Sequence, residues 1–222
     1  MGRNKYSVEE RDTILRSFIR CTKEIMETEG VEHVSTRKLA SLTGYNSAKL
    51  YFYFKNIDDL IAMASVGYTE KYCRALAADM SRLTNAYEFA VHAWDIFCRC
   101  AFDEPALYYR LFFGKRETPL QELVDEYYRL YPAQLEKMDP SVREFMMNGD
   151  LSKRTMITLR RLLAEGIVVE DKLPVVNELM VSYFKSLLEE RMEGNGSLIQ
   201  AEELKDRFMK AFCLLIESAK KA

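Results

Sequence analysis

Positive charge in this chain is concentrated between Glu32 and Asp58. That stretch contains no acidic residue, and its basic residues are Arg37, Lys38, Lys49 and Lys55. The whole chain of 222 residues carries 32 Lys and Arg against 34 Asp and Glu, so the basic stretch stands out against an acidic background. Basic side chains gathered in this way bind phosphate groups, and the stretch therefore predicts contact with nucleic acid.

The same stretch predicts two short helices joined by a tight turn. Ser35 is a good N-terminal cap for the first helix, and Gly44 tolerates the positive φ that a sharp reversal of the chain demands. Asn46 or Ser47 can then cap the second helix. These are the features of a helix-turn-helix, whose second helix enters the major groove of DNA.

The outward face of the second helix predicts how DNA is contacted. Leu50 and Phe54 lie one helical turn apart and are expected to face the core, which leaves the opposite face to the DNA. Base edges are expected to be read by Arg37, Ser47 and Lys49, with Tyr45 at the leading edge. Phosphates are expected to be held by Thr36, Tyr51, Tyr53 and Lys55.

An ordinary packing unit is the alternative interpretation of this helix pair. In that case Tyr51, Tyr53 and Phe54 are simply aromatic residues of the core. The acid-free basic stretch and the correct cap and turn residues favour DNA binding instead.

From Phe18 to about Ala64 the sequence resembles the N-terminal DNA-binding domain of the tetracycline-repressor (TetR) family of bacterial transcription regulators. The resemblance is carried by Gly30, Thr36-Arg37-Lys38-Leu39-Ala40, Gly44, Leu50-Tyr51-x-Tyr53-Phe54 and Asp58-Asp59-Leu60. The family commonly has lysine where this chain has Ile57, and small residues where it has Ala48 and Lys49. The resemblance thus implies one phosphate contact fewer at Ile57, and a base-reading side chain at Lys49.

The sequence predicts an all-α fold with two domains. Residues 1–56 are expected to form the helix-turn-helix domain of three helices, and residues 57–222 a helical domain for effector binding and dimerisation. Ser7 and Glu10 form a capping box that begins the first helix. Later helices are expected at residues 86–102, 105–113, 119–131, 141–147, 152–165, 174–192 and 198–220.

A long fourth helix is expected to connect the two domains. Asn56 caps it, Asp58 and Asp59 complement its dipole, and it is expected to extend to about Leu83. Gly67 weakens it in the middle and is a candidate position for a bend, although a simple packing role is the alternative.

Aromatic residues are crowded in the first half of the second domain. Most are expected to be core, yet buried phenol hydroxyls need polar partners, and so many of them favour a ligand cavity with a few polar groups. The resemblance to the TetR family likewise implies an effector pocket in this domain. The candidate lining residues are Tyr68, Tyr72, His92, Trp94, Phe97, Tyr109, Phe112 and Tyr128.

The last two long helices have apolar faces wide enough to contact two partners. Burial of both faces inside one chain is the alternative. The resemblance implies that these helices form a four-helix bundle with those of a second copy, and a two-fold homodimer matches a palindromic DNA operator. The expected interface residues are Tyr183, Phe184, Leu187, Phe208, Phe212 and Leu215.

Other protein classes find little support in the sequence. Its apolar runs fall short of the roughly 20 residues that a membrane helix needs, and its N-terminus is too polar for a signal peptide, so a cytoplasmic protein is expected. Five scattered cysteines and two histidines predict neither a disulfide framework nor a metal site. No catalytic residues and no cofactor are expected.

Two rival functions remain for such a sequence. An enzyme is disfavoured because no phosphate-binding glycine loop, nucleophile elbow or metal-ligand cluster is found. A dimeric helical adaptor or nucleoid-associated protein with the same fold, and without a response to an effector, is the closer rival. Ile57 favours that rival, whereas Arg37, Lys49 and Lys55 argue against it.

Overall fold

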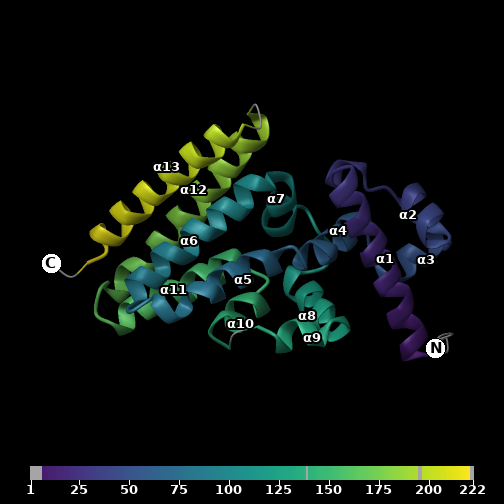
Figure 1. Cartoon of the computed structure of the whole chain (residues 1–222), viewed down its shortest axis with the longest axis horizontal. Helices are drawn as coiled ribbons and strands as arrows, with labels where there is room; N and C mark the ends of the chain where they lie inside the picture. The colour runs from purple at the N-terminus through teal and green to yellow at the C-terminus, as the bar shows by residue number, and fades with distance from the viewer. Residues whose placement is uncertain (1–6, 139, 195–196, 221–222) are drawn as a thin grey trace.

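The computed structural model describes residues 7–138, 140–194 and 197–220, and every regular element in these ranges is helical (Figure 1). The all-α prediction is confirmed. The α-helices are α1 Val8–Thr28, α2 Thr36–Thr43, α3 Ser47–Tyr53, α4 Ile57–Val66, α5 Thr69–Asp79, α6 Ala86–Asp103, α7 Pro105–Phe113, α8 Leu120–Leu130, α9 Pro132–Glu136, α10 Pro140–Met147, α11 Leu151–Ala164, α12 Leu173–Glu193 and α13 Leu198–Ser218. Short 3₁₀ turns lie at Val31–His33, Met80–Arg82 and Glu170–Lys172.

Local capping sets where most of these helices begin. The predicted capping box is present, with the Ser7 side chain accepting from the Glu10 backbone and the Glu10 carboxylate accepting from the Ser7 backbone. Side-chain caps also begin α2, α3, α4, α6, α11 and α13. Because each cap satisfies a backbone N–H that the helix cannot, the predicted starts lie within one residue of the observed ones.

The expected long fourth helix is two helices in the structure. Helix α4 ends at Val66 and α5 begins at Thr69, so the predicted continuation to Leu83 is wrong. A Cβ atom at Gly67 would lie 2.0 Å from Lys23 Nζ and 2.4 Å from the Tyr127 hydroxyl. The break therefore coincides with a point where α1 and α8 approach the backbone too closely for any side chain.

Helix α4 lies between the two ends of the molecule. The helix-turn-helix formed by α2 and α3 lies at one end with α1, and the remaining helices form the larger body (Figure 1). Helix α4 packs on α1 on one side and on α7 and α8 on the other. All of its residues from Asp59 to Val66 are buried, which explains why its sequence is apolar on every face.

Helices α12 and α13 lie side by side and pack on α6, with α12 also packing on α7 and α11. Their largest side chains face this core: Phe184, Leu187, Phe208 and Phe212 are each at most 1% exposed. These four residues do not offer a surface to a second copy, and this part of the interface prediction is corrected. Tyr183 and Leu215 are half-buried at the edge of the same core.

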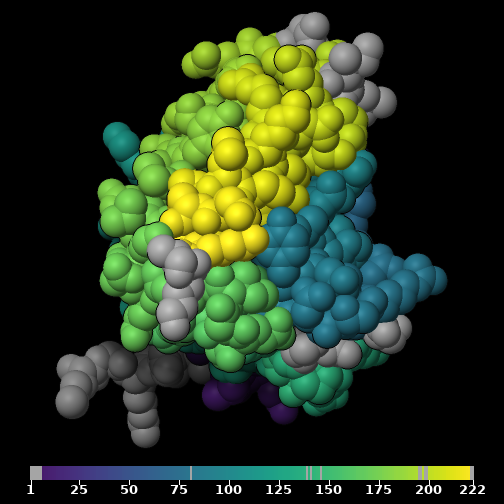
Figure 2. Space-filling model, turned by 90° about the vertical axis from the view of Figure 1, so that its left-hand side faces the viewer, coloured from purple at the N-terminus to yellow at the C-terminus, as the bar shows by residue number. Residues whose placement is uncertain are grey.

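A different set of apolar residues on α12 and α13 faces outward. Figure 2 shows α13 lying along the surface beside α12. The exposed apolar residues of the pair are Val175, Leu179, Met192 and Leu214. Among the helices of the described residues, none is both long and apolar enough to span a membrane.

Candidate nucleic-acid interface and ligand cavity

The turn between α2 and α3 has the geometry that the sequence predicts. Gly44 adopts the left-handed conformation with φ +72°, and its N–H donates to the Ala40 carbonyl over 3.1 Å. The Asn46 side chain accepts from the Lys49 backbone N–H over 3.0 Å, so Asn46 rather than Ser47 is the cap of α3. Glycine adopts the left-handed conformation without strain because it has no Cβ atom. This conformation at Gly44 sets the angle between α2 and α3.

One side of the helix pair is fixed to α1. Leu39, Leu50 and Phe54 are buried, and the Tyr45 ring lies 5.8 Å from that of Phe18 on α1. Ile57, where the family commonly has lysine, is half-buried against the same core. This packing decides which face of α3 is left to solvent.

The opposite face of α3 presents polar and aromatic side chains outward. Ser47 is exposed, and Tyr51 and Phe52 are 53% and 64% exposed. The Tyr51 hydroxyl lies 3.3 Å from Thr36 Oγ1 on α2, which joins the two helices across the surface. Large aromatic rings exposed together need a reason, and a surface that binds a partner provides one. Phe52 was not among the predicted contact residues, although its helical position opposite Leu50 already indicates exposure.

The basic residues of the predicted interface differ in how freely they are presented. Arg37 and Lys55 are exposed, and Lys55 Nζ donates to the Glu117 carbonyl over 3.3 Å. Lys49 is half-buried, with Nζ 5.6 Å from the centre of the Tyr45 ring. Tyr53 packs against the core, and its hydroxyl is buried. Tyr53 is therefore the predicted phosphate contact that lies furthest from solvent.

The start of α4 is tied to the loop between α7 and α8. Asp59 is completely buried, and its carboxylate accepts from the backbone N–H groups of Glu117 and Thr118 and from the Thr118 hydroxyl, the last over 2.6 Å. Arg110 on α7 forms a half-exposed ion pair with Asp58 over 3.2 Å. These bonds connect the first turn after the helix-turn-helix to the body. The sequence suggested only a helix-dipole role for Asp59, because its partners are almost 60 residues away.

A second connection lies at the other end of α4. Lys23 Nζ on α1 donates to the Tyr127 hydroxyl on α8 over 2.8 Å and lies 4.9 Å from the centre of its ring. The Tyr127 hydroxyl in turn donates to Gln134 over 2.9 Å. Burial lowers the pKa of Lys23, because the charged amine loses hydration. This cluster covers Gly67, where α4 gives way to α5.

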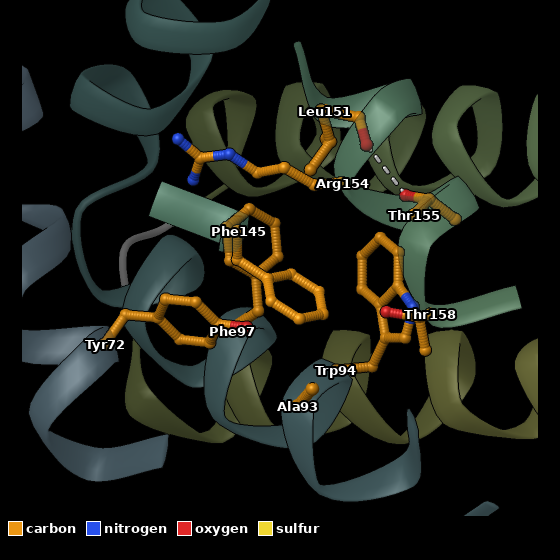
Figure 3. Close-up of a pocket in the computed structure, with 9 residues that line it drawn as sticks. All are labelled: Tyr72, Ala93, Trp94, Phe97, Phe145, Leu151, Arg154, Thr155 and Thr158. Atoms are coloured by element: carbon orange, nitrogen blue, oxygen red, sulfur yellow. Dashed lines mark hydrogen bonds between the residues drawn. The ribbon is translucent and has the colours of Figure 1, made fainter. Parts of the chain in front are cut away.

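The body contains a small cavity between α5, α6, α10 and α11 (Figure 3). Its lining residues are Tyr72, Ala93, Trp94, Phe97, Phe145, Leu151, Arg154, Thr155 and Thr158. The rings of Trp94, Phe97 and Phe145 gather around it, and the Arg154 side chain extends along one side, past the Phe145 ring. Its volume of about 30 Å³ is roughly the room of one or two water molecules.

Three of the eight predicted pocket residues line this cavity, namely Tyr72, Trp94 and Phe97. Two more lie beside Arg154. The Phe112 ring is 5.1 Å from its guanidinium carbon. Burial raises the pKa of the Tyr128 hydroxyl, and the nearby Arg154 charge opposes that rise. The other three lie elsewhere, as the next contacts show.

Tyr68 donates to the Lys23 carbonyl at the boundary with α1. His92 lies 3.1 Å from Asp79, and Tyr109 hydrogen-bonds Glu189 over 3.0 Å. The spacing of residues along a helix does not show which side of that helix faces α11. The sequence therefore gave no geometric basis for placing Tyr68, His92 and Tyr109 in the pocket. Phe145 and Arg154 were missed for the same reason.

The chain is similar to one family model and to several solved structures. The family model described as bacterial regulatory proteins, tetR family, matches residues 18–64. No curated protein is significantly similar to the chain. Among solved structures, Thermus thermophilus FadR, described as a TetR-family transcriptional repressor in complex with lauroyl-CoA, has a TM-score of 0.61 at 14% identity, with 94% of this chain and 96% of that chain covered. RolR in complex with resorcinol has a TM-score of 0.59 at 13% identity, with 97% of each chain covered.

At these identities the solved structures establish the shared fold. The family match covers the second half of α1, all of α2, the turn and α3, and most of α4. Helices α2 and α3 build the exposed face described above. Residues 18–64, which contain this helix-turn-helix, match the tetR family of bacterial regulatory proteins, and the chain as a whole shares the fold of FadR and RolR.

Proposed function

We propose that this protein is a ligand-responsive, sequence-specific transcription regulator that binds a palindromic operator as a homodimer and is released by a small, partly apolar effector. The observation that carries the proposal is the placement of α4. This single buried helix packs on α1, on which α2 of the helix-turn-helix also packs, and it continues, through Gly67, toward the helix that contributes Tyr72 to the cavity.

The exposed face of α2 and α3 supports DNA reading. Arg37, Ser47 and Lys49 are proposed to contact base edges, because the N-terminal half of the second helix meets the bases in a helix-turn-helix. Thr36, Tyr51, Tyr53 and Lys55 are proposed to contact the phosphates, with Tyr45 at the leading edge of the helix. Lys49 must leave the Tyr45 ring to reach a base, and Tyr53 must turn its hydroxyl outward.

The cavity supports an effector response. The structures of Thermus thermophilus FadR and of RolR, which share the fold, hold lauroyl-CoA and resorcinol respectively. A cavity of about 30 Å³ admits a small molecule only if its lining helices move apart. Such movement of α5 is expected to reach α4 directly, since the two helices are joined at Gly67 and Tyr68.

The connection to DNA is mechanical. Two reading heads on a dimer must lie about 34 to 36 Å apart to enter successive major grooves on one face of B-DNA. Asp59 and Lys55 tie each head to the α7–α8 loop, so a tilt of α4 changes the position of the head. Only a ligand that prefers the DNA-incompetent arrangement shifts this equilibrium.

The exposed apolar residues of α12 and α13 support the homodimer. Val175, Leu179 and Leu214 are 59%, 48% and 72% exposed on two long neighbouring helices, which is unusual unless a partner covers them. A two-fold pairing of these helices places two helix-turn-helix units on one molecule, as a palindromic site requires.

Selection of duplexes from a random-sequence DNA pool tests the proposal. We expect enrichment of an inverted repeat whose half-sites lie about one helical turn apart. Recovery of duplexes without any common sequence would instead support the rival function, an adaptor or nucleoid-associated protein of the same fold.

A further inference from the structure

A groove at the boundary between the helix-turn-helix end and the body has a different set of lining residues from the cavity at Trp94. Its first part, of about 460 Å³, lies between the end of α1 and the junction of α6 and α7. Its second part, of about 300 Å³, lies between α1, α5 and the same junction. Glu27, Tyr68 and Glu104 line both parts, so the two parts meet at these residues. This boundary groove has the size of a small-molecule site, which is typically about 300–1,000 Å³.

The centre of the boundary groove carries negative charge. Glu27 comes from α1 and Glu104 from the α6–α7 junction, and both are exposed. Among the described residues, neither carboxylate forms an ion pair with a basic side chain. Burial raises the pKa of the Tyr68 hydroxyl, and the charges of Glu27 and Glu104 raise that pKa further. Tyr68 therefore stays neutral, and the charge at the centre is that of the two carboxylates.

The second part of the groove adds basic residues to this centre, namely Lys23, Lys71 and Arg74. The side chains of Lys71 and Arg74 are 73% and 76% exposed, and their ion pairs with Asp103 and Glu70 are 3.9 and 3.8 Å long. Exposed ion pairs of this length contribute little, so both cations are available to an anion in the groove. Negative and positive groups thus line one space of about 300 Å³.

The first part of the groove adds an apolar floor. Met26 and Val31 lie at the end of α1 and in the turn that follows it, and Leu107 lies on α7; all three are buried. Pro105 and Ala106 are half-buried beside Leu107. An apolar group placed against this floor loses contact with water, which is favourable.

Two further carboxylates of the first part already have partners. Glu29 pairs with Lys38 on α2, and the Glu32 carboxylate lies 3.3 Å from the His33 ring. These contacts take up part of the negative charge near the apolar floor. The strongest attraction for an added cation is therefore at the centre of the groove.

We infer that the boundary groove binds a free amino acid with an apolar side chain. Its ammonium group lies between Glu27 and Glu104, its carboxylate meets Lys71 and Arg74, and its side chain covers the apolar floor. The three groups of such a molecule branch from one carbon atom. This arrangement matches a groove in which negative, positive and apolar walls meet at shared residues, because opposite charges attract and like charges repel.

The inference goes beyond the proposed function. A bound amino acid contacts α1 on one side and the α6–α7 junction on the other, and so it holds the helix-turn-helix end to the body. Binding in the groove requires neither the effector cavity at Trp94 nor a second copy of the chain.

A purely structural role for these side chains makes a different prediction. Glu27 then only supports the contact of α1 with Tyr68, and the groove holds solvent. In that case small molecules bind without regard to their charges. Comparison of several ligands on one protein separates the two roles, because the stability of the protein cancels from a ratio of affinities.

L-Leucine and analogues that each lack one of its groups are the matched probes. The analogue 4-methylpentanoate lacks the ammonium group, 3-methylbutylamine lacks the carboxylate, and glycine lacks the apolar side chain. Isothermal titration calorimetry on the full chain without DNA measures their affinities. We expect L-leucine to bind about threefold or more tightly than each analogue, since partly exposed charge pairs contribute that much.

Equal affinities for the four compounds, or no binding of L-leucine at millimolar concentrations, overturn the inference. A preference for L-leucine over only one of the two singly charged analogues also overturns it, because both charges are then not recognised.

Variants at the two charged walls give the second test. Glu104→Gln is expected to reduce the advantage of L-leucine over 4-methylpentanoate, and Arg74→Gln its advantage over 3-methylbutylamine. Glu24→Gln on α1 and Arg82→Gln replace exposed residues outside the groove and are the matched controls, expected to keep both ratios. A ratio that stays unchanged in its own groove variant contradicts the inference. Operator binding enters none of these measurements, so their failure leaves the proposed function as it stands.

Discussion

The reading face of α3 is defined by a few residues whose roles differ. Lys49 lies near the N-terminus of the helix, where side chains meet base edges, whereas Lys55 follows the helix and is exposed at its far end. Tyr51 and Phe52 fill the surface between them. Charge alone thus does not tell a base contact from a phosphate contact, but position on the helix does.

We predict that Lys49→Ala and Lys55→Ala weaken DNA binding in different ways. Lys49→Ala is expected to cost about 1–3 kcal/mol on the selected operator and to relax its base preference. Lys55→Ala is expected to weaken operator and random duplexes alike and to flatten the dependence of affinity on salt. Mobility shifts at several salt concentrations measure both; equal losses on both duplexes for Lys49→Ala exclude a base contact.

Asp59 is the residue that fastens the reading head to the body. We predict that Asp59→Ala lowers the free energy of unfolding by on the order of 3 kcal/mol, because it leaves the buried N–H groups of Glu117 and Thr118 without their acceptor. Asp58→Ala is the matched control, since its half-exposed pair with Arg110 contributes about 1 kcal/mol or less. Urea unfolding measures both, and similar losses for the two variants would show that the Asp59 bonds matter little.

Helix α4 ends at Gly67, a residue with helical backbone angles that lies against the side chains of Lys23 and Tyr127. The residues on both sides of this glycine favour helix, and the break occurs where Lys23 and Tyr127 leave no room for a Cβ atom. An element that is fully buried and ends at such a contact moves only together with its neighbours.

We predict that Gly67→Ala destabilises the protein by about 1–3 kcal/mol through overpacking. Lys23→Ala in the same chain is expected to recover part of this loss, because it removes the nearest atoms, whereas Tyr127 keeps its hydroxyl in place. A double-mutant cycle by thermal unfolding gives the coupling energy. Strictly additive effects would mean that Lys23 does not limit the space at Gly67.

Sequence reasoning succeeded for elements that local residues define. The caps Ser35, Asn46 and Asn56 each bond a backbone N–H three residues away, so the sequence alone places the helix-turn-helix. It failed where the answer depends on distant residues. Gly67 was identified as the weak point of the fourth helix, but not as its end, and the orientation of Phe212 toward the core depends on which helix lies opposite.

Helix α9 is a second element that the sequence did not predict. The sequence predicts no helix between residues 131 and 141, yet Pro132 occupies the first turn of a short helix, a position where the missing N–H of proline costs nothing. The lining of the cavity likewise depends on distant residues, since Arg154 and Phe145 reach Trp94 only through the packing of α10 and α11 on α6.

At the scale of the whole molecule, the outer face of α12 and α13 is the expected contact between two copies. We predict that Leu179→Glu and Leu214→Glu leave the fold intact and dissociate the dimer, because both side chains are exposed in the single chain. Phe212→Glu is the contrasting variant and is expected to unfold the chain, since it buries a carboxylate in the core. Light scattering and circular dichroism distinguish the two outcomes; a monomer in the unmodified protein at micromolar concentration would remove the basis for the dimer.

The proposed regulation links the two ends of the molecule, and thermodynamics requires such a link to be reciprocal. If a ligand in the cavity lowers the affinity for operator by some factor, operator lowers the affinity for ligand by the same factor. The most direct test is therefore a titration of small, partly apolar candidate effectors monitored by Trp94 fluorescence, with and without saturating operator duplex. The proposed mechanism predicts weaker ligand binding when operator is present, by the factor found for operator release; identical ligand affinity in both titrations would contradict it.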